Sequence, residues 1–287
     1  MLYINNNALV ETEWLAAHLK APDVVVVDGS WYLPQQGRDP KAEYAEGHIP
    51  GAVYFDIDEI ADTASPLPHM FPSSDRFAEQ VGGLGISNGH HVVVYDGLGL
   101  FSAARVWWMF RAFGHEQVSI LNGGLPKWQA ENRPLQSGPV RRTPTRFRPT
   151  FRHNMVRGLE HMRANLATGR EQVLDARAAG RFSGEEPEVR PGLRGGHIPG
   201  SRNLPFGGLL DPDTKTLKDP AALQAEFANA GIDLGRRPVV TTCGSGISAC
   251  NLALGLYLLG HRDVAIYDGS WTEWGGQEDT PVETGPA

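Results

Sequence analysis

One cysteine of the sequence lies where a thiol could act as a nucleophile. Cys243 ends a short apolar run and opens a loop in which Gly244 and Gly246 permit positive φ and close backbone approach. Successive amides of such a loop can point at one anion, and a helix beginning near Ile247 or Ser248 would add partial positive charge. A cysteine in this setting is expected to have thiolate character at neutral pH and to hold an anionic group on its sulfur. The sequence therefore predicts nucleophilic, covalent chemistry at Cys243.

Each of the two cysteines also has a second interpretation. Cys243 could be only a small buried residue at a strand end, but strand, glycine-rich loop and helix coincide there, as thiol activation requires. Cys250 lies about two helical turns further on, inside an apolar segment, and is expected to pack in the core. Two cysteines are too few for a disulfide scaffold or a cysteine-rich zinc site, so no metal and no organic cofactor is expected. Ala249 stands where cysteine phosphatases carry a phosphate-clamping arginine, which argues against phosphate-monoester hydrolysis.

The chain contains the same series of segments twice. Four pairs of segments recur in the same order, at offsets of 146 to 149 residues. The clearest pair is GHIPGA at 47–52 with GHIPGS at 196–201. The other pairs are the strand-like runs that end at Asp28 and Asp175, those that end before Asp96 and Cys243, and the segments that end at Trp128 and Trp274. Such a repeat indicates two copies of one domain. We predict an N-terminal domain at 1–136, a linker at 137–156 and a C-terminal catalytic domain at 157–287. Asp96 occupies the cysteine position of the first copy, which is therefore expected to be inactive.

Each copy has the pattern of an α/β domain. In the second copy, strand-type apolar runs and helical patterns alternate: strands at 172–177, 201–206, 236–243 and 263–268, and helices at 221–232 and 248–260. This alternation predicts a mainly parallel sheet with helices on both faces. Ligands of such sheets bind at the carboxyl ends of the strands, where Cys243 lies.

Composition and charge limit the class of protein. The chain has 287 residues, 41% of them hydrophobic, and a net charge of −7, as expected of a globular protein of about two domains without general attraction for nucleic acid. Its longest aliphatic run, 24–27, is far too short to span a membrane. The N-terminus lacks the pattern of a signal peptide, so we expect a cytoplasmic protein, and a monomer. Five arginines between 141 and 152 are interpreted as a solvated linker that crosses an acidic domain face.

Taken together, these segments resemble the rhodanese sulfurtransferases over most of the chain. Two α/β copies, each with GHIPG, and a six-residue cysteine loop carry the resemblance. Within that family, the loop CGSGISA at 243–249 is similar to that of the 3-mercaptopyruvate sulfurtransferases. Thiosulfate-type rhodaneses carry basic residues in this loop, where Gly244 and Ser248 stand here. The absence of loop cations suits a keto-acid thiol better than the thiosulfate dianion.

Two further segments carry the same resemblance. GRFSGEEPEVR at 180–190 is similar to a family segment whose two arginines hold the substrate carboxylate and carbonyl, which implies that role for Arg181 and Arg190. An arginine fork suits a 2-oxo acid through paired hydrogen bonds. On spacing alone, both arginines would be read as solvent-exposed partners of neighbouring glutamates.

The first copy contributes a third segment, FDIDEIADTASPLPHM at 55–70. It resembles a family segment whose aspartate and histidine act with the loop serine, which implies a constellation of Asp58, His69 and Ser245. His48 and His197, in the two GHIPG motifs, are interpreted as structural because the inactive copy keeps one.

The resemblance implies a two-step sulfur transfer. The Cys243 thiolate takes the sulfur of 3-mercaptopyruvate, pyruvate leaves, and the persulfide is held by the loop residues Gly244, Gly246, Ile247 and Ser248. A thiol, for example of a thioredoxin-like protein, or cyanide then accepts the sulfur. The alternatives are a thiosulfate sulfurtransferase and a non-catalytic persulfide carrier, which would need only the cysteine.

Overall fold

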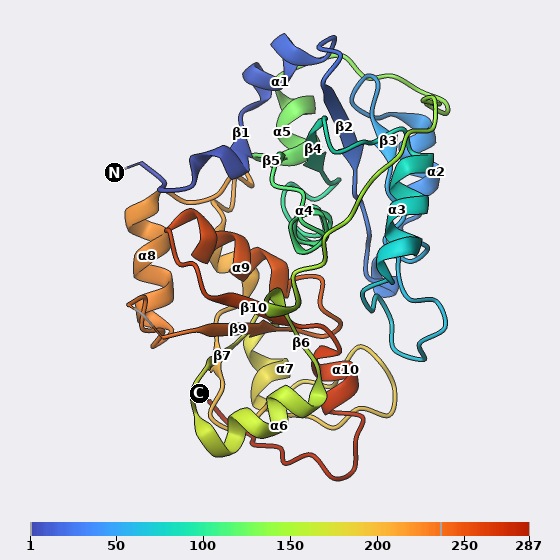
Figure 1. The fold of residues 1–287 in the computed structure, drawn as a ribbon. Coiled ribbons are helices and arrows are strands. Elements are labelled where there is room, and N and C mark those ends of the chain that lie inside the picture. The colour runs from blue at the N-terminus through green and yellow to red at the C-terminus, as the bar shows by residue number, and fades with distance from the viewer. Residues whose placement is uncertain (1, 236, 287) are drawn as a thin grey trace.

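The chain folds into two halves, each built on a five-stranded parallel sheet (Figure 1). The computed structural model describes residues 2–235 and 237–286. The outermost residues of the two expected domain ranges, and the first residue of the strand expected at 236–243, therefore lie outside the described residues. The first sheet has the order β1-β5-β4-β2-β3 and consists of β1 Leu9–Val10, β2 Val24–Asp28, β3 Val53–Tyr54, β4 His91–Tyr95 and β5 Val118–Leu121.

The second sheet repeats the first strand by strand. It has the order β6-β10-β9-β7-β8 and consists of β6 Val156–Arg157, β7 Gln172–Asp175, β8 Arg202–Asn203, β9 Val239–Thr242 and β10 Val264–Tyr267. All pairings between these strands are parallel. The identical order confirms the duplicated α/β fold that the repeated segments predict.

Helices cover both faces of each sheet (Figure 1). The first half holds α1 Thr12–His18, α2 Pro40–Glu46, α3 Ser74–Gly83, α4 Ala103–Ala112 and α5 Gly124–Ala130, and the second holds α6 Leu159–Thr168, α7 Ala179–Ser183, α8 Pro220–Asn229, α9 Ala249–Leu258 and α10 Ser270–Trp274. Short 3-10 turns lie at Asn6–Ala8, Pro34–Gln36, His153–Met155 and Phe206–Leu209. The central strands are buried on both faces: Val94 and Val93 of β4 belong to different apolar clusters. This double burial explains why these strands are continuous apolar runs.

The two halves share one core. Helices α4 and α9 lie between the two sheets and pack on each other (Figure 1). The rings of Trp107 and Tyr257 are 5.4 Å apart, and the Asn251 side-chain amide donates to the Phe101 carbonyl at 2.8 Å. Because α9 packs on its own sheet and on α4, nearly all of its residues are buried, as its uniformly apolar sequence predicts.

The linker and the N-terminal segment pack on different halves of the chain. The predicted linker lies along the first half, where the Thr145 amide donates to the Gly82 carbonyl at 2.8 Å and Arg152 pairs with Glu116 at 2.6 Å. The N-terminal segment lies instead against the second half, where the Ile4 amide donates to the Leu258 carbonyl at 2.9 Å. The domain limits at 136/137 and 156/157 stay predictions.

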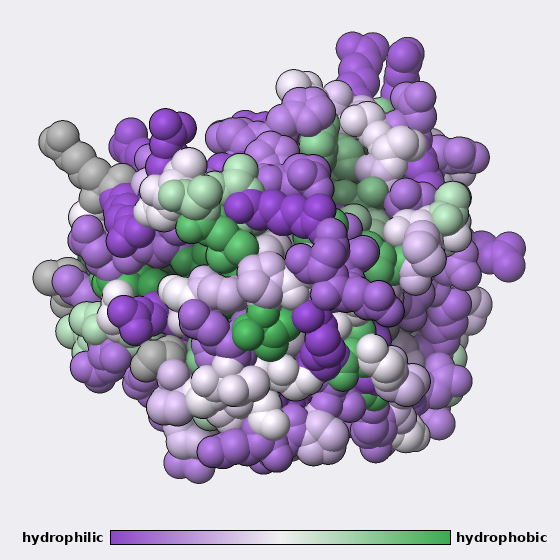
Figure 2. Space-filling view, turned by 90° about the horizontal axis from the view of Figure 1, so that it is seen from below, coloured by the Kyte–Doolittle hydropathy of each residue, from purple (hydrophilic) through white to green (hydrophobic). Residues whose placement is uncertain are grey.

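Several element boundaries differ from the sequence prediction, two of them next to the site. The strand expected at 201–206 is only two residues long, because Pro205 has no amide to donate and a 3-10 turn begins at Phe206. The helix expected from Ile247 or Ser248 begins at Ala249, with Ser248 as its N-cap residue. Within the described residues, no helix has the length and apolar character needed to span a membrane. The face seen in Figure 2 is mostly hydrophilic, with small separate apolar areas.

Candidate active site

Cys243 lies at the carboxyl edge of the second sheet, directly after β9. Its amide donates to the Ser270 hydroxyl at 3.2 Å, and its carbonyl accepts from the Trp271 amide at 2.9 Å, so the start of α10 fixes the loop. The residue is buried but lines a cavity of about 190 Å³. The cavity is bounded by both halves: Trp31, Leu33 and Phe101 from the first, and Ala176–Ala178, Arg181, Val189, Arg190, Phe206, Cys243–Ser245, Ile247 and Ser248 from the second.

The two glycines of the cysteine loop are required for different structural reasons. Gly246 has φ +78°, and a Cβ there would lie 2.9 Å from the Asp268 carbonyl oxygen, so this position requires glycine. A Cβ on Gly244 would lie 3.4 Å from an Arg181 nitrogen and 3.7 Å from an Arg190 nitrogen. Any larger side chain at 244 would therefore press on the two arginines.

Ser245, His69 and Asp58 form a chain of hydrogen-bonded side chains. The Ser245 hydroxyl oxygen is 3.0 Å from Nδ1 of His69, and Nε2 of His69 is 3.0 Å from a carboxylate oxygen of Asp58. The Trp31 indole N–H lies 3.2 Å from both Asp58 oxygens. The hydrogen bond from His69, assisted by Trp31 and opposed by burial, lowers the pKa of Asp58. The arrangement can orient the His69 ring and move a proton to or from Ser245.

Two residues that the sequence analysis did not single out hold this chain against the cysteine loop. Arg105 of α4 is fully buried, donates to the His69 carbonyl, and reaches the Gly246 carbonyl at 3.2 Å and Asp268 at 2.9 Å. The other Asp268 oxygen accepts from the Phe71 amide at 2.7 Å. His69 itself has φ +63°, a left-handed conformation that is costly for a non-glycine residue and that these contacts maintain. Arg105, one of two arginines among the apolar residues of α4, was the signal in the sequence for the first of these residues.

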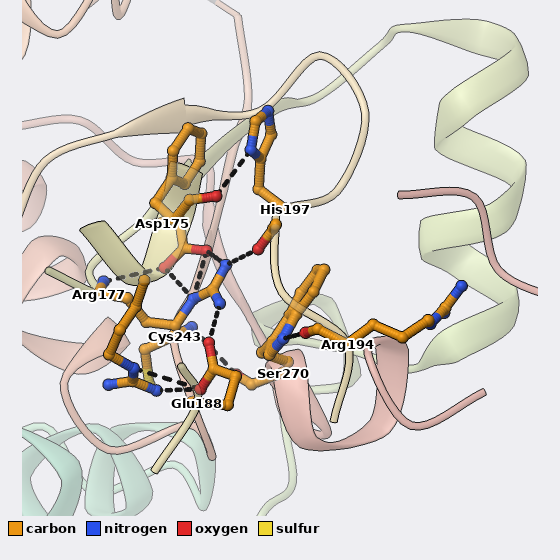
Figure 3. A network of polar contacts seen from close by, with 12 residues as sticks. Asp175, Arg177, Glu188, Arg194, His197, Cys243 and Ser270 are labelled. Carbon is orange, nitrogen blue, oxygen red and sulfur yellow. Dashed lines mark hydrogen bonds and ion pairs between the residues drawn. The ribbon is translucent and has the colours of Figure 1, made fainter. Parts of the chain in front are cut away.

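The two predicted substrate arginines line the cavity but differ in their partners. Arg181 pairs with the buried carboxylate of Glu188 at 2.5 Å, and Glu188 also pairs with Arg177 at 2.5 Å, which in turn binds Asp175 (Figure 3). The alternative reading of Arg181, as a partner of a nearby glutamate, therefore describes a real contact.

Arg190 has no carboxylate partner among the described residues, and its guanidinium lies 3.3 Å from the Ser245 hydroxyl. Burial lowers the pKa of Arg190, the Cys243 side chain opposes that shift, and the neighbouring charge of Arg181 adds to it. Three arginines and two carboxylates in this corner leave one excess positive charge, that of Arg190. The cavity is therefore prepared for an anionic ligand.

The remaining predicted residues lie around the same loop. Ile247 and Ser248 line the cavity, whereas Gly246 lies behind it against Asp268. Cys250 is fully buried with its sulfur 3.2 Å from the Gly246 carbonyl oxygen, and burial raises the pKa of its thiol far above the ordinary range. Cys250 is therefore placed for packing, not for reaction.

In the first half, a carboxylate occupies the place of the thiol. Asp96 follows β4 as Cys243 follows β9, and its two oxygens accept from the backbone amides of Leu98 at 2.8 Å, Phe101 at 2.7 Å and Ala103 at 2.8 Å. This loop is one residue longer than the loop of the second half. The first copy thus shows an anion held by loop and helix amides at the position equivalent to the cysteine.

The GHIPG histidines have equivalent structural contacts in both halves. Nδ1 of His48 lies 2.7 Å from the Tyr44 carbonyl oxygen, and Nδ1 of His197 lies 2.9 Å from that of Phe182. Each ring also stacks on the aromatic ring of the same partner. These contacts fix the turn before the outer strand, in agreement with a structural role.

Known proteins with this arrangement are found by both sequence and structure. Residues 11–131 and 159–277 each match the family model of the rhodanese-like domain. The 3-mercaptopyruvate sulfurtransferase of Homo sapiens is 48% identical over 273 residues, covering 93% of this chain and 91% of that protein. The thiosulfate sulfurtransferase of Cricetulus griseus is 48% identical over 284 residues, covering 96% and 94%. The crystal structure of SseA from Escherichia coli, described with the rhodanese fold and mechanism of 3-mercaptopyruvate sulfotransferases, superposes with a TM-score of 0.84 at 39% identity, covering 92% and 98%. The chain therefore belongs to the rhodanese family and contains two rhodanese-like domains in tandem.

Proposed function

We propose that the protein is a 3-mercaptopyruvate sulfurtransferase that carries the sulfur on Cys243. The observation behind the proposal is that one cavity is lined by a thiol, by a half-buried arginine without a carboxylate partner, and by Ser245, the first member of the Ser245–His69–Asp58 chain. A persulfide carrier would need only the first of these. A 2-oxo acid that carries a thiol has use for all three.

In this proposal, substrate binding rests on the two arginines. The carboxylate and carbonyl oxygens of 3-mercaptopyruvate accept hydrogen bonds from Arg190 and from the Arg181 nitrogens that Glu188 leaves free. Glu188 is buried and bridges Arg177 and Arg181, so it fixes the direction of the Arg181 fork. A rigid pair of donors keeps the substrate sulfur at the Cys243 thiolate and lowers the entropic cost of the reaction.

The first chemical step moves a sulfur atom. The Cys243 thiolate attacks the substrate sulfur and forms the S–S bond, while the C–S bond breaks and its electron pair passes into the enolate of pyruvate. The arginines stabilise the developing charge on the enolate oxygen. The thiol proton passes through the Ser245 hydroxyl, assisted by His69, to the enolate carbon, so pyruvate and a Cys243 persulfide anion remain.

The persulfide anion needs positive potential around its outer sulfur. The carboxylate of Asp96 in the first half supports such a role for the loop, because it accepts three backbone N–H groups at the position equivalent to Cys243. In the second half, the amides between Gly244 and Ser248 would serve the persulfide in the same way. A thiolate acceptor, for example of a thioredoxin-like protein, or cyanide then attacks the outer sulfur and regenerates the Cys243 thiolate.

Thiosulfate sulfurtransferase activity is the second candidate, since one of the similar proteins has that name. Thiosulfate has no carboxylate, no carbonyl and no proton to be moved. Its reaction would not use the Ser245–His69 pair for proton transfer. Gly244, whose lack of a side chain leaves room for Arg181 and Arg190, also favours the keto acid.

A comparison of donors tests the proposal. Initial rates with cyanide as acceptor are measured for 3-mercaptopyruvate and for thiosulfate, with Cys243→Ser as the control for uncatalysed transfer. We expect kcat/KM to be much higher for mercaptopyruvate. A higher value for thiosulfate would favour the second candidate, and no turnover of either donor would favour a carrier.

The proposal extends to the state of the protein in solution. We expect a monomer, to be measured by light scattering after size exclusion, and a cytoplasmic enzyme, to be checked by cell fractionation. Domain limits of 1–136 and 157–287 can be tested by limited proteolysis, with cleavage expected in the linker at 137–156.

A further inference from the structure

A second cavity, of about 320 Å³, lies between the two halves and away from the cysteine loop. Trp108 and Arg111 line it from the last turns of α4, and Tyr257 from the last turn of α9. The first turns of the same two helices lie at the cysteine loop, so a helix length of about 15 Å separates the two sites. The rest of the wall consists of residues 152, 154, 155, 157, 171, 238 and 261–264.

Arg111 is a buried cation with no counter-ion in this wall. It is 9% exposed, and its guanidinium stacks over the ring of Tyr257 at 4.0 Å and lies 5.1 Å from that of Trp107. Within residues 2–235 and 237–286, no carboxylate or carbonyl oxygen accepts a hydrogen bond from it; the Tyr257 side chain and, at longer range, Glu116 support its charge, and its Nε is fully enclosed. Burial lowers the pKa of Arg111. A guanidinium that is removed from water without an acceptor is costly, and stacking on aromatic faces offsets only part of that cost.

Two other enclosed polar groups in the wall also lack partners. The indole N–H of Trp108 and Nε2 of His261 are buried without a hydrogen bond to any described residue. Each of these residues is less than a tenth exposed and lines the cavity together with Arg111. Neither of these enclosed groups pairs with Arg111, so both leave its charge uncompensated.

The net charge around the cavity is also positive. Arg157 is paired with Glu171 at 2.7 Å, and Arg152 with Glu116 at 2.6 Å. The exposed rim adds one arginine and one aspartate, residues 262 and 263, which offset each other. After these pairs are counted, the charge of Arg111 remains.

We propose that this cavity binds a small molecule through a sulfate or phosphate group, with Arg111 as its principal ligand. A guanidinium offers two parallel N–H groups to such a group, and its stacking on Tyr257 holds them in place before binding. The cavity is larger than one tetrahedral ion needs, so an ester that carries the group can enter it. This inference does not depend on the proposed sulfur transfer.

Calorimetric titration of the full chain tests the proposal, with inorganic sulfate, inorganic phosphate and glycerol 3-phosphate as probes and chloride at equal ionic strength as the reference. We expect saturable binding of the oxoanions at one site and none of chloride. Tighter binding of glycerol 3-phosphate than of inorganic phosphate would identify the ligand as an ester. Tighter binding of inorganic phosphate would identify it as a free oxoanion.

Variants locate the site. Arg111→Met, which keeps an unbranched side chain between the rings, should weaken binding about tenfold or more, as expected for a lost charged hydrogen bond. Arg262→Gln changes an exposed residue of the rim and leaves the wall intact; it should weaken binding severalfold through the loss of a nearby positive charge. Arg141→Gln, an exposed arginine outside the wall, should not change it. Binding that disappears in Arg190→Gln belongs to the catalytic cavity. That result, no saturable binding, or unchanged binding in a folded Arg111→Met variant would overturn the proposal.

Discussion

The hydroxyl oxygen of Ser245 lies 3.0 Å from Nδ1 of His69, although the two residues belong to different halves of the chain. The first half has Asp96 at the position of the cysteine, but it supplies His69, Asp58 and the buried Arg105 to the contacts around the cysteine loop of the second. Duplication thus left one half free to become a support for the other.

The Ser245–His69 contact predicts non-additive losses. His69→Ala and Ser245→Ala should each lower kcat with mercaptopyruvate by about 10²–10⁴-fold, the usual effect of removing an acid–base group. The double variant should be little worse than either single one, since the two groups act as a unit. Steady-state kinetics of the three variants decide the matter, and multiplicative losses would rule out a shared proton path.

Arg190 should matter more to the keto acid than to thiosulfate. Arg190→Ala should cost about 2–4 kcal/mol of transition-state stabilisation with mercaptopyruvate, because a charged hydrogen bond is lost in a partly dry site. Arg181→Ala, the matched control, should cost less, since Glu188 already takes part of its bonding capacity. The ratio of kcat/KM for the two donors is the readout, and equal losses on both donors would mean that the arginines act on the fold of the loop.

Arg105 is predicted to position His69 and the cysteine loop without touching the substrate. Arg105→Met leaves the buried Asp268 without its partner and should destabilise the fold by about 3–5 kcal/mol in urea denaturation. Arg105→Lys keeps the charge but cannot reach His69, Gly246 and Asp268 together. It should therefore lower kcat and shift the pH profile while KM changes little. A folded lysine variant with normal kcat and pH profile would show that these contacts are only structural.

Asp58 should contribute to stability at neutral pH and lose that contribution in acid. Its pKa in the folded protein lies below the ordinary value of 3.8, chiefly because His69 donates to it. A group whose pKa is lowered on folding stabilises the protein above its unfolded pKa, and the effect disappears as the pH falls through the folded pKa. The free energy of unfolding of Asp58→Asn should consequently fall less steeply below pH 4 than that of the wild type. Identical slopes would contradict the pairing with His69.

The two cysteines should react at different rates. Cys243 lines the cavity, whereas Cys250 is enclosed and burial raises its thiol pKa far above neutrality. Iodoacetamide at neutral pH should therefore label Cys243 first, as peptide mass spectrometry would show. Faster labelling of Cys250 would invalidate the assignment of the nucleophile.

The parts of this site that the sequence predicts are the local ones. The cysteine loop follows from a strand, two glycines and a helix that are neighbours in the chain, and its observed start differs from expectation by only a residue or two. The two sheets follow from repeated apolar runs. In these cases the physical cause lies within a few residues of its effect.

Contacts between distant residues could not be derived in that way. His69 and Ser245 are 176 positions apart in the sequence, and Arg105 and Asp268 are 163 apart. A local pattern of apolar and polar residues therefore cannot predict either contact. The first pair came from resemblance to a family, and the second was missed. The early end of β8 at Asn203 depends on a single Pro205, a detail that an apolar run does not reveal.

Cys243 is proposed to receive the sulfur of 3-mercaptopyruvate. The most direct measurement mixes the enzyme with this donor in the absence of an acceptor, quantifies pyruvate and determines the mass of the peptide that contains Cys243. The account predicts one pyruvate released per enzyme and one added sulfur atom on Cys243, with none on Cys250. Pyruvate formed without sulfur on Cys243, or sulfur found on another residue, would contradict it.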